Sequence, residues 1–293
     1  MMRSAGGSIM EALVSTQWLA ENGGAGDLKI LDASLFLPEM GRDARAEFAD
    51  GHIPGARFMT LAAIADPDAG LPMMLPQDEA FADHMRALGI DSGDRVVLYD
   101  GSPLHSAARG WWMLRVFGAE QVAILDGGIA RWQAEGRQLE TGNLPYDPGD
   151  FATRSDRSGV RDLAAMKANL DSGAEQVVDA RSPARFAGSE PESRPGVEPG
   201  HIPGSRNLYY PGLFHSDGTW KRGKELAAAI EAAGVDIDRP IVTTCGSGVT
   251  AAVLTFGLHL LGRQAALYDG SWSEWGAEPT APKELGPKEL GKA

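Results

Sequence analysis

The residue best suited to chemistry is Cys245, the only cysteine among 293 residues. It lies in the stretch TTCGSGVTAA, residues 243–252, among small and β-branched side chains. A single cysteine excludes intrachain disulfides and any metal site that needs several cysteines. Three interpretations remain open at this point: a buried structural thiol, a reactive thiol, or a thiol that bridges two molecules.

The residues that follow Cys245 favour a reactive thiol. Gly246 and Gly248 permit backbone conformations that a residue with a Cβ resists. A loop of this composition can curl so that several N–H groups point inward and form a site for an anion. The helix expected to begin near Val249 adds the positive end of its dipole. A thiolate would be stabilised there, and so would an anionic adduct on its sulfur.

The elements that must position this loop occur twice, because the chain is a tandem repeat of itself. Each half has an apolar run that ends in aspartate, followed by the tetrapeptide His-Ile-Pro-Gly. Three pairs of segments match in the same order: 29–58 with 176–207, 95–101 with 240–246, and 123–132 with 265–275. This register places Asp100 opposite Cys245, so only the second half has a nucleophile at this point. We therefore expect one working domain and one supporting domain.

Short apolar runs alternate with helical stretches in both halves. Their length and bordering turn residues are typical of strands in a buried parallel sheet. The expected strands are 29–32, 96–99, 122–125, 176–179, 241–244 and 265–268. Residues 106–118 and 249–262 have the pattern of helices closed by glycine. The sequence thus predicts an α/β fold twice over, each half a mainly parallel sheet flanked by helices.

Composition sets the expected domain boundaries. Residues 141–159 are rich in Pro, Gly, Asp and Ser and lack periodicity. We expect a supporting domain over 10–142, a linker over 143–159 and a catalytic domain over 160–280. The repeated Pro-Lys-Glu-Leu-Gly motif within 281–293 predicts a flexible tail.

Charge and hydropathy exclude several classes of function. The formal net charge is −13 and no basic stripe is evident, which excludes a nucleic-acid partner. No run of about 18 apolar residues could span a membrane. The first residues lack the apolar centre of a secretory signal, so a cytoplasmic protein is expected. We expect neither a metal nor a cofactor, and an anionic substrate would need a local cluster of arginines.

Over residues 10–280 the chain resembles the tandem rhodanese-type sulfurtransferases. The resemblance rests on the paired GHIPG segments, on WWMLRVFG at 111–118, on YDGSWSEWG at 268–276 and on the loop CGSGVT. Family members that use thiosulfate typically have two cationic residues directly after the cysteine. Gly246 and Ser247 stand there in this chain, and this neutral loop is similar to that of 3-mercaptopyruvate sulfurtransferases.

The resemblance implies a reaction and a site. Cys245 attacks the sulfur of 3-mercaptopyruvate, pyruvate leaves, and the persulfide sulfur passes to a thiol, thioredoxin or cyanide. Arg185 and Arg194 are implied to hold the substrate, since planar guanidinium groups suit the carboxylate and ketone of a 2-oxo acid. Five loop residues complete the implied substrate site, with the Ser247 hydroxyl as a donor: Gly246, Ser247, Gly248, Val249 and Thr250.

One departure from the family pattern affects the mechanism. Related enzymes often carry an Asp and a His that would form a proton-relay triad with the loop serine. Ala62 and Met73 stand at those positions here, so that triad cannot operate. Either the electrostatics of the loop and helix alone activate the thiolate, or the preferred reaction differs from the usual one.

Other interpretations of the loop remain open. The chain could use thiosulfate as its donor, or it could carry a persulfide between partners without turnover. A phosphatase or arsenate reductase is disfavoured, because those enzymes usually have an arginine six residues after the cysteine, where this chain has Ala251.

Several further residues are predicted to be structural. His52 and His201 occur in both halves, including the half without a nucleophile, so neither is expected to act as a catalytic base. Trp111 and Trp112 are expected in the core or between the domains. The strand-end residues Asp32 and Asp179 would each cap a turn.

Overall fold

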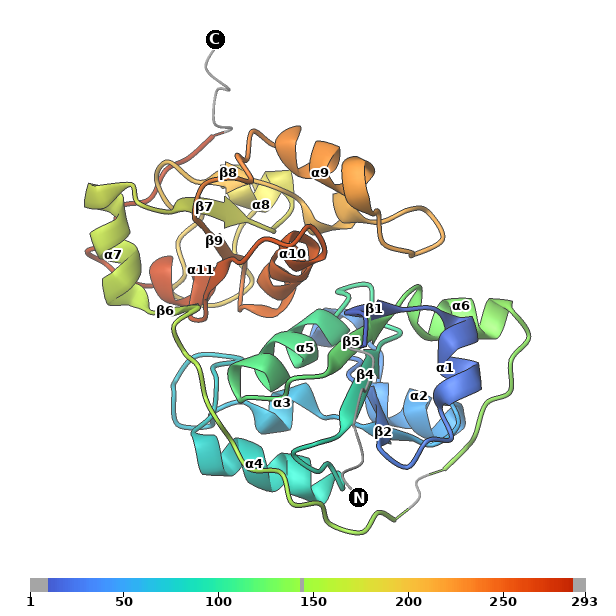
Figure 1. Cartoon of the computed structure of the whole chain (residues 1–293). Helices are drawn as coiled ribbons and strands as arrows, with labels where there is room; N and C mark the ends of the chain where they lie inside the picture. The colour runs from blue at the N-terminus through green and yellow to red at the C-terminus, as the bar shows by residue number, and fades with distance from the viewer. Residues whose placement is uncertain (1–9, 143–144, 287–293) are drawn as a thin grey trace, which may run out of the picture.

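The two halves of the chain form two parallel sheets of the same topology. The computed structural model describes residues 10–142 and 145–286, and each half contains a five-stranded sheet flanked by helices (Figure 1). The strand order is β1-β5-β4-β2-β3 in the first sheet and β6-β10-β9-β7-β8 in the second. Each strand of the first sheet thus has a counterpart five places later, and the predicted tandem α/β fold is confirmed.

The predicted strands correspond to β2, β4, β5, β7, β9 and β10. The strands missed by sequence are the edge strands, which have only two or three residues. The first sheet consists of β1 (Leu13–Val14), β2 (Leu28–Asp32), β3 (Ala56–Phe58), β4 (Arg95–Tyr99) and β5 (Val122–Leu125). The second consists of β6 (Val160–Arg161), β7 (Gln176–Asp179), β8 (Arg206–Asn207), β9 (Ile241–Thr244) and β10 (Ala266–Tyr268).

The helices cover both faces of each sheet. Those of the first half are α1 (Thr16–Asn22), α2 (Ala44–Asp50), α3 (Leu61–Ile64), α4 (Asp78–Ala87), α5 (Ala107–Val116) and α6 (Gly128–Ala134). Those of the second half are α7 (Leu163–Ser172), α8 (Pro183–Ala187), α9 (Gly223–Glu231), α10 (Val249–Leu260) and α11 (Ser271–Trp275). Two 3₁₀ turns, η1 (Pro38–Met40) and η2 (Tyr210–Leu213), lie in loops. None of the helices described is long and apolar enough to cross a membrane.

The alternating direction of side chains along the central strands explains why helices cover both faces of each sheet. In β4, Val96 and Leu98 join the cluster with α3, α4 and α5, whereas Val97 and Tyr99 join the cluster with α1, α2 and α6. Successive side chains of a strand point to opposite faces, so a continuous apolar run requires helices on both sides.

One hydrophobic core continues from the first domain into the second. It joins α3, α4 and α5 to α9, α10 and the buried side of the Cys245 loop. Trp111 of α5 packs edge-on against Phe256 of α10, with ring centroids 4.9 Å apart. The prediction that Trp111 lies in the core or between the domains is confirmed, and the two domains form one continuous packing unit.

The segment expected as a linker is a strap packed on the first domain. Residues 143–144 lie outside the described part of the chain, while 145–159 run along this domain before reaching β6 (Figure 1). Phe151 is buried beside Phe81 and Phe117, and the hydroxyl of Tyr146 donates to the carbonyl of Ala56 at 3.0 Å. Composition predicted the lack of regular structure here but gave no sign of this packing.

Packing of the second domain also continues past residue 280. Ala281 is buried, and the indole of Trp275 donates to the carbonyl of Pro282 at 2.9 Å. Glu284 exchanges two backbone hydrogen bonds with His201. The rest of the expected tail, 287–293, lies outside the described residues.

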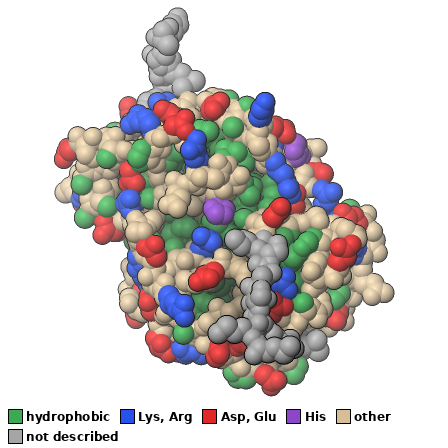
Figure 2. Space-filling model, in the orientation of Figure 1, with side chains coloured by type: hydrophobic (Ala, Val, Ile, Leu, Met, Phe, Trp, Pro, Cys, Tyr) green, Lys and Arg blue, Asp and Glu red, His purple; other side chains and the backbone are tan. Residues whose placement is uncertain are grey.

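Acidic and basic side chains are interspersed over the visible face of both domains (Figure 2). This distribution resembles that of an ordinary protein surface rather than a track for a phosphate backbone.

Candidate active site

Cys245 lies at the carboxyl end of β9, directly before the loop that leads into α10. Its side chain is buried, and the backbone N–H of Gly248 donates to the sulfur at 3.1 Å. Gly248 has a φ of +79°, the left-handed conformation that glycine tolerates best. The loop curls so that the N–H of Gly248 points at the sulfur, whereas several such N–H groups were expected.

Residues after β10 hold the other side of the loop. The N–H of Cys245 donates to the hydroxyl of Ser271 at 3.3 Å, and that hydroxyl donates to the carbonyl of Tyr268 at 2.9 Å. The carbonyls of Cys245 and Gly246 accept from the N–H groups of Trp272 and Ser273 at 2.9 and 3.0 Å. The loop backbone is thus anchored on both sides of the sulfur.

The two predicted arginines meet at Gly246. A Cβ placed on Gly246 would lie 3.3 Å from Nη2 of Arg185, so that guanidinium lies directly over the glycine. Nη1 of Arg194 donates to the carbonyl of Gly246 at 3.4 Å and also to the hydroxyl of Ser273. Two cations from separate segments therefore lie beside the residue that follows the cysteine.

The two guanidinium groups beside Gly246 could hold an anion. Burial lowers the pKa of Arg194, and the nearby charge of Arg185 lowers it further, while charges at Cys245 and Glu192 act in the opposite direction. A negative group bound between two half-buried guanidinium groups would offset the repulsion between their charges. The local cluster of arginines required by the net charge is present.

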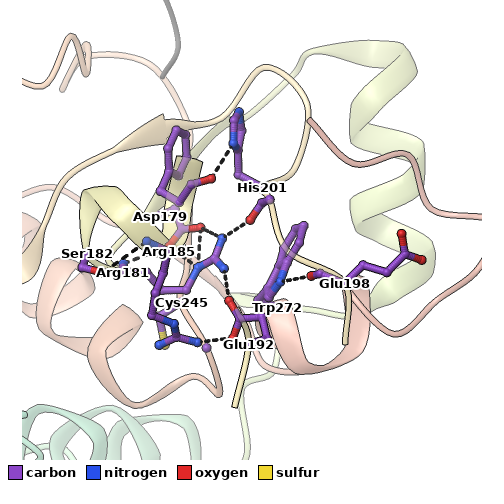
Figure 3. A network of polar contacts seen from close by, with 12 residues as sticks. Asp179, Arg181, Ser182, Arg185, Glu192, Glu198, His201, Cys245 and Trp272 are labelled. Carbon is purple, nitrogen blue, oxygen red and sulfur yellow. Dashed lines mark hydrogen bonds and ion pairs between the residues drawn. The ribbon is translucent and has the colours of Figure 1, made fainter. Parts of the chain in front are cut away.

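Glu192 fixes the position of Arg185. Figure 3 shows this carboxylate between Arg181 and Arg185. It pairs with Arg181 at 2.9 Å and with Arg185 at 2.5 Å. Arg181 is fully buried, pairs with Asp179 at 2.6 Å, and lies over the ring of Trp272. Burial alone would lower the pKa of Arg181, but the charges of Asp179 and Glu192 hold it above its ordinary value. Ion pairs thus connect Asp179 through Arg181 and Glu192 to the Arg185 guanidinium.

Asp100 occupies the corresponding position in the first domain, at the end of β4. Its two oxygens accept from the N–H groups of Ser102 and Ala107 at 3.0 and 2.7 Å. Burial raises the pKa of this carboxyl to about 7, although the two backbone hydrogen bonds act in the opposite direction. The N–H group at the start of α5 is therefore already satisfied, and no nucleophile is present there.

Comparison with known proteins places this geometry in a family. Residues 15–135 and 162–278 each match the rhodanese-like domain. The chain belongs to the rhodanese family. The 3-mercaptopyruvate sulfurtransferase of Rattus norvegicus is 43% identical over 274 residues, covering 91% of this chain and 92% of the rat protein.

Two further relatives support the assignment. Thiosulfate/3-mercaptopyruvate sulfurtransferase 1, mitochondrial, of Arabidopsis thaliana is 42% identical, covering 94% of this chain and 79% of its own length. The crystal structure of SseA from Escherichia coli, described as a 3-mercaptopyruvate sulfotransferase, gives a TM-score of 0.83 at 38% identity, covering 90% of this chain and 99% of that structure. This rhodanese-family chain is a sulfurtransferase.

The remaining loop residues lie around the cysteine of this rhodanese-type site. Ser247 and Thr250 are half-buried, and Val249 is buried at the first position of α10. Ala62 is exposed on α3. Met73 has a left-handed φ of 62°, and its carbonyl accepts from Arg109. Neither the Ala62 nor the Met73 side chain can transfer a proton, so these two positions supply no proton relay to the loop serine.

The residues predicted to be structural have structural contacts. Nδ1 of His52 and of His201 each lies 2.8 Å from a carbonyl, of Phe48 and Phe186 respectively, and each ring stacks on that phenylalanine. The two histidines occupy matching positions in the two rhodanese-like domains, and the first domain has no cysteine. These contacts are structural in both domains.

The two strand-end aspartates behave alike. Asp32 and Asp179 each accept the N–H two residues later, at 2.9 Å, as expected of a residue that caps a turn.

Sequence reasoning missed the residues that support the site. Arg181 lies two residues after the end of β7, and Ser271 lies within YDGSWSEWG, a segment already singled out as part of the repeat. Their positions near a strand end and within the repeat were signals that could have marked both residues as part of the site. Glu192 carried no signal of its own, because its role depends on two arginines brought to it by the fold.

Proposed function

We propose that this enzyme takes the sulfur of 3-mercaptopyruvate onto Cys245 and passes it to a thiol acceptor, releasing pyruvate. The observation that carries the proposal is the approach of Arg185 and Arg194 to Gly246, beside a cysteine whose next two residues are neutral. Guanidinium groups match the carboxylate and ketone of a 2-oxo acid.

The first half-reaction forms the persulfide. The Cys245 thiolate attacks the sulfur of the substrate, an S–S bond forms, and the C–S bond breaks with its electron pair moving to carbon. The resulting enolate takes a proton and leaves as pyruvate. Arg185 and Arg194 bind the carboxylate and the oxygen on which charge develops, which is the part that an electrostatic site can accelerate. The Ser247 hydroxyl donates a further hydrogen bond to the same oxygen or to the reacting sulfur.

The second half-reaction returns the thiolate. An acceptor thiolate, either a small thiol or thioredoxin, attacks the outer sulfur of the persulfide, and Cys245 leaves as the thiolate. Cyanide can take the sulfur in the same way. The N–H of Gly248, 3.1 Å from the Cys245 sulfur, stabilises negative charge on it in both half-reactions. A reducing compartment such as the cytoplasm suits this cycle, because the thiol must survive between turnovers.

Thiosulfate is the second candidate donor, because the Arabidopsis relative is named for both donors. The two donors differ in charge and shape, and the residues directly after Cys245 carry no cation for a doubly charged sulfur anion. We favour the keto acid, because the cations here are the planar guanidinium groups of Arg185 and Arg194, which lie beside Gly246.

The test compares the two donors side by side at equal concentration. With 3-mercaptopyruvate we expect pyruvate release, one sulfur atom added at Cys245, and repeated turnover once a thiol is supplied. Cys245→Ser should show none of these. Turnover with thiosulfate that equals or exceeds that with 3-mercaptopyruvate would overturn the donor assignment. Loading with one sulfur but no turnover would identify a persulfide carrier instead.

A further inference from the structure

A buried arginine of the first domain reaches the catalytic loop of the second. Arg109 lies on α5, and its side chain is fully buried with the guanidinium over the ring of Trp112. Nη1 donates to the carbonyl of Gly248 at 3.4 Å. Nη2 donates to Asp269 at 2.8 Å and to the carbonyl of Met73.

We propose that Arg109 is a positioning residue for the Cys245 thiolate. Gly248 is held from both sides: its carbonyl accepts from Arg109, and its N–H donates to the Cys245 sulfur. The contact with Arg109 holds this residue in the left-handed conformation that aims the N–H at the sulfur. The first domain thus contributes to the reacting group through one side chain, although it has no nucleophile of its own.

The ion pair between Arg109 and Asp269 explains how the positive charge of Arg109 is tolerated in the core. Asp269 is buried, and its second oxygen accepts the N–H of Leu75 of the first domain at 2.7 Å. Its carbonyl lies 3.2 Å from the place where a Cβ on Gly248 would be, and Nη1 of Arg109 lies 2.8 Å from that place. There is no room for a side chain at position 248, so the guanidinium packs directly against the loop backbone.

The inference rests on Cys245 being the reacting thiol, but its test needs no sulfur donor. The chain has a single cysteine, so ultraviolet absorbance of the thiolate reports Cys245 once the same variant carrying Cys245→Ser is subtracted. The pH at which this absorbance is half-developed measures how well the loop holds the thiolate. Three other ionisable groups interact electrostatically with Cys245 and stay unchanged in every variant: Arg181, Arg194 and Tyr210.

The main variant is the double replacement Arg109→Met with Asp269→Asn, which removes both buried charges together. We expect a cooperative melt and a midpoint about one pH unit higher, or about tenfold less thiolate at a fixed pH below the midpoint, because one hydrogen bond to a charged sulfur is lost. Arg115→Met is the matched control, since Arg115 is an exposed arginine on the same helix, and its midpoint should not move.

Two single variants separate the positioning role from a purely structural one. Asp269→Asn leaves Arg109 as an unpaired cation, so its midpoint should stay or fall. Arg109→Lys keeps the ion pair but has fewer donors in one plane, so its midpoint should rise by less than that of the double variant. A folded double variant with an unchanged midpoint of thiolate formation would refute the proposal, and Arg109 would then only stabilise the contact between the domains. If the double variant does not fold, an unchanged midpoint in Arg109→Lys refutes the proposal equally.

Discussion

Replacing Arg194 by methionine tests the substrate site most directly. Methionine keeps an unbranched apolar stem but is shorter than arginine, and it lacks the guanidinium group and its charge. The loop should survive the change, because the carbonyl of Gly246 still accepts from the backbone N–H of Ser273. Any loss of activity then reports the missing guanidinium rather than a collapsed loop.

The expected loss follows from the hydrogen bonds that a carboxylate or enolate oxygen would make. Hydrogen bonds to charged groups contribute about 1.5–3 kcal/mol, which corresponds to about a 10- to 150-fold fall in kcat/KM. A rise in KM alone would place Arg194 on the carboxylate, while a fall in kcat would place it on the oxygen where charge develops. Arg194→Lys should recover part of the loss, since charge returns without the planar fork.

The assay is pyruvate release from 3-mercaptopyruvate with a saturating thiol. Arg239→Met serves as the control, because Arg239 is exposed and donates to the carbonyl of Gly173 at 3.3 Å, away from the loop. If folded Arg194→Met matched that control in kcat/KM, the role assigned to Arg194 would be refuted. The same comparison with Arg185→Met tests the second cation.

Two further predictions concern stability. Phe151→Ala should lower the free energy of unfolding by about 3–5 kcal/mol in urea, because a buried ring of the strap is removed; a loss below about 1 kcal/mol would mean that the strap does not hold the first domain. Asp100 has its pKa raised to about 7 in the folded state against 3.8 for the unperturbed group, so the folded protein retains a proton that the unfolded chain has released. Stability should therefore fall as pH rises between these two values and level off above about 7, and the slope should be smaller in Asp100→Asn. Equal slopes of melting temperature against pH in the two proteins would contradict this assignment.

The parts of the site that follow from local sequence were predictable. The Cys245 loop, its helix and its strand are contiguous, and the internal repeat is enough to locate them at a strand end. Arg185 and Arg194 needed the family resemblance, since nothing in their own neighbourhood marks them as ligands. Arg109 and Asp269 were beyond reach, because 160 residues separate two side chains whose roles exist only when they meet.

The domain boundaries show the same limit. Low periodicity correctly indicated that 145–159 has no helix or strand, but isolated aromatic residues such as Phe151 have no periodic pattern that would reveal their burial. The edge strands β1, β3, β6 and β8 were missed because pairing with a neighbour, rather than propensity, defines strands of two or three residues.

The carboxyl of Asp100 also shows how the two halves differ at equivalent positions. At the strand end where the second half has its thiol, the first half has a buried carboxyl, which cannot form a persulfide. Seven residues lead from Asp100 to the first residue of α5, against four from Cys245 to the first residue of α10. A mutation of Asp100 to cysteine would therefore place a thiol in a loop of different length, already shaped around two oxygen atoms. The two domains therefore differ in the backbone of this loop as well as in the residue at its start.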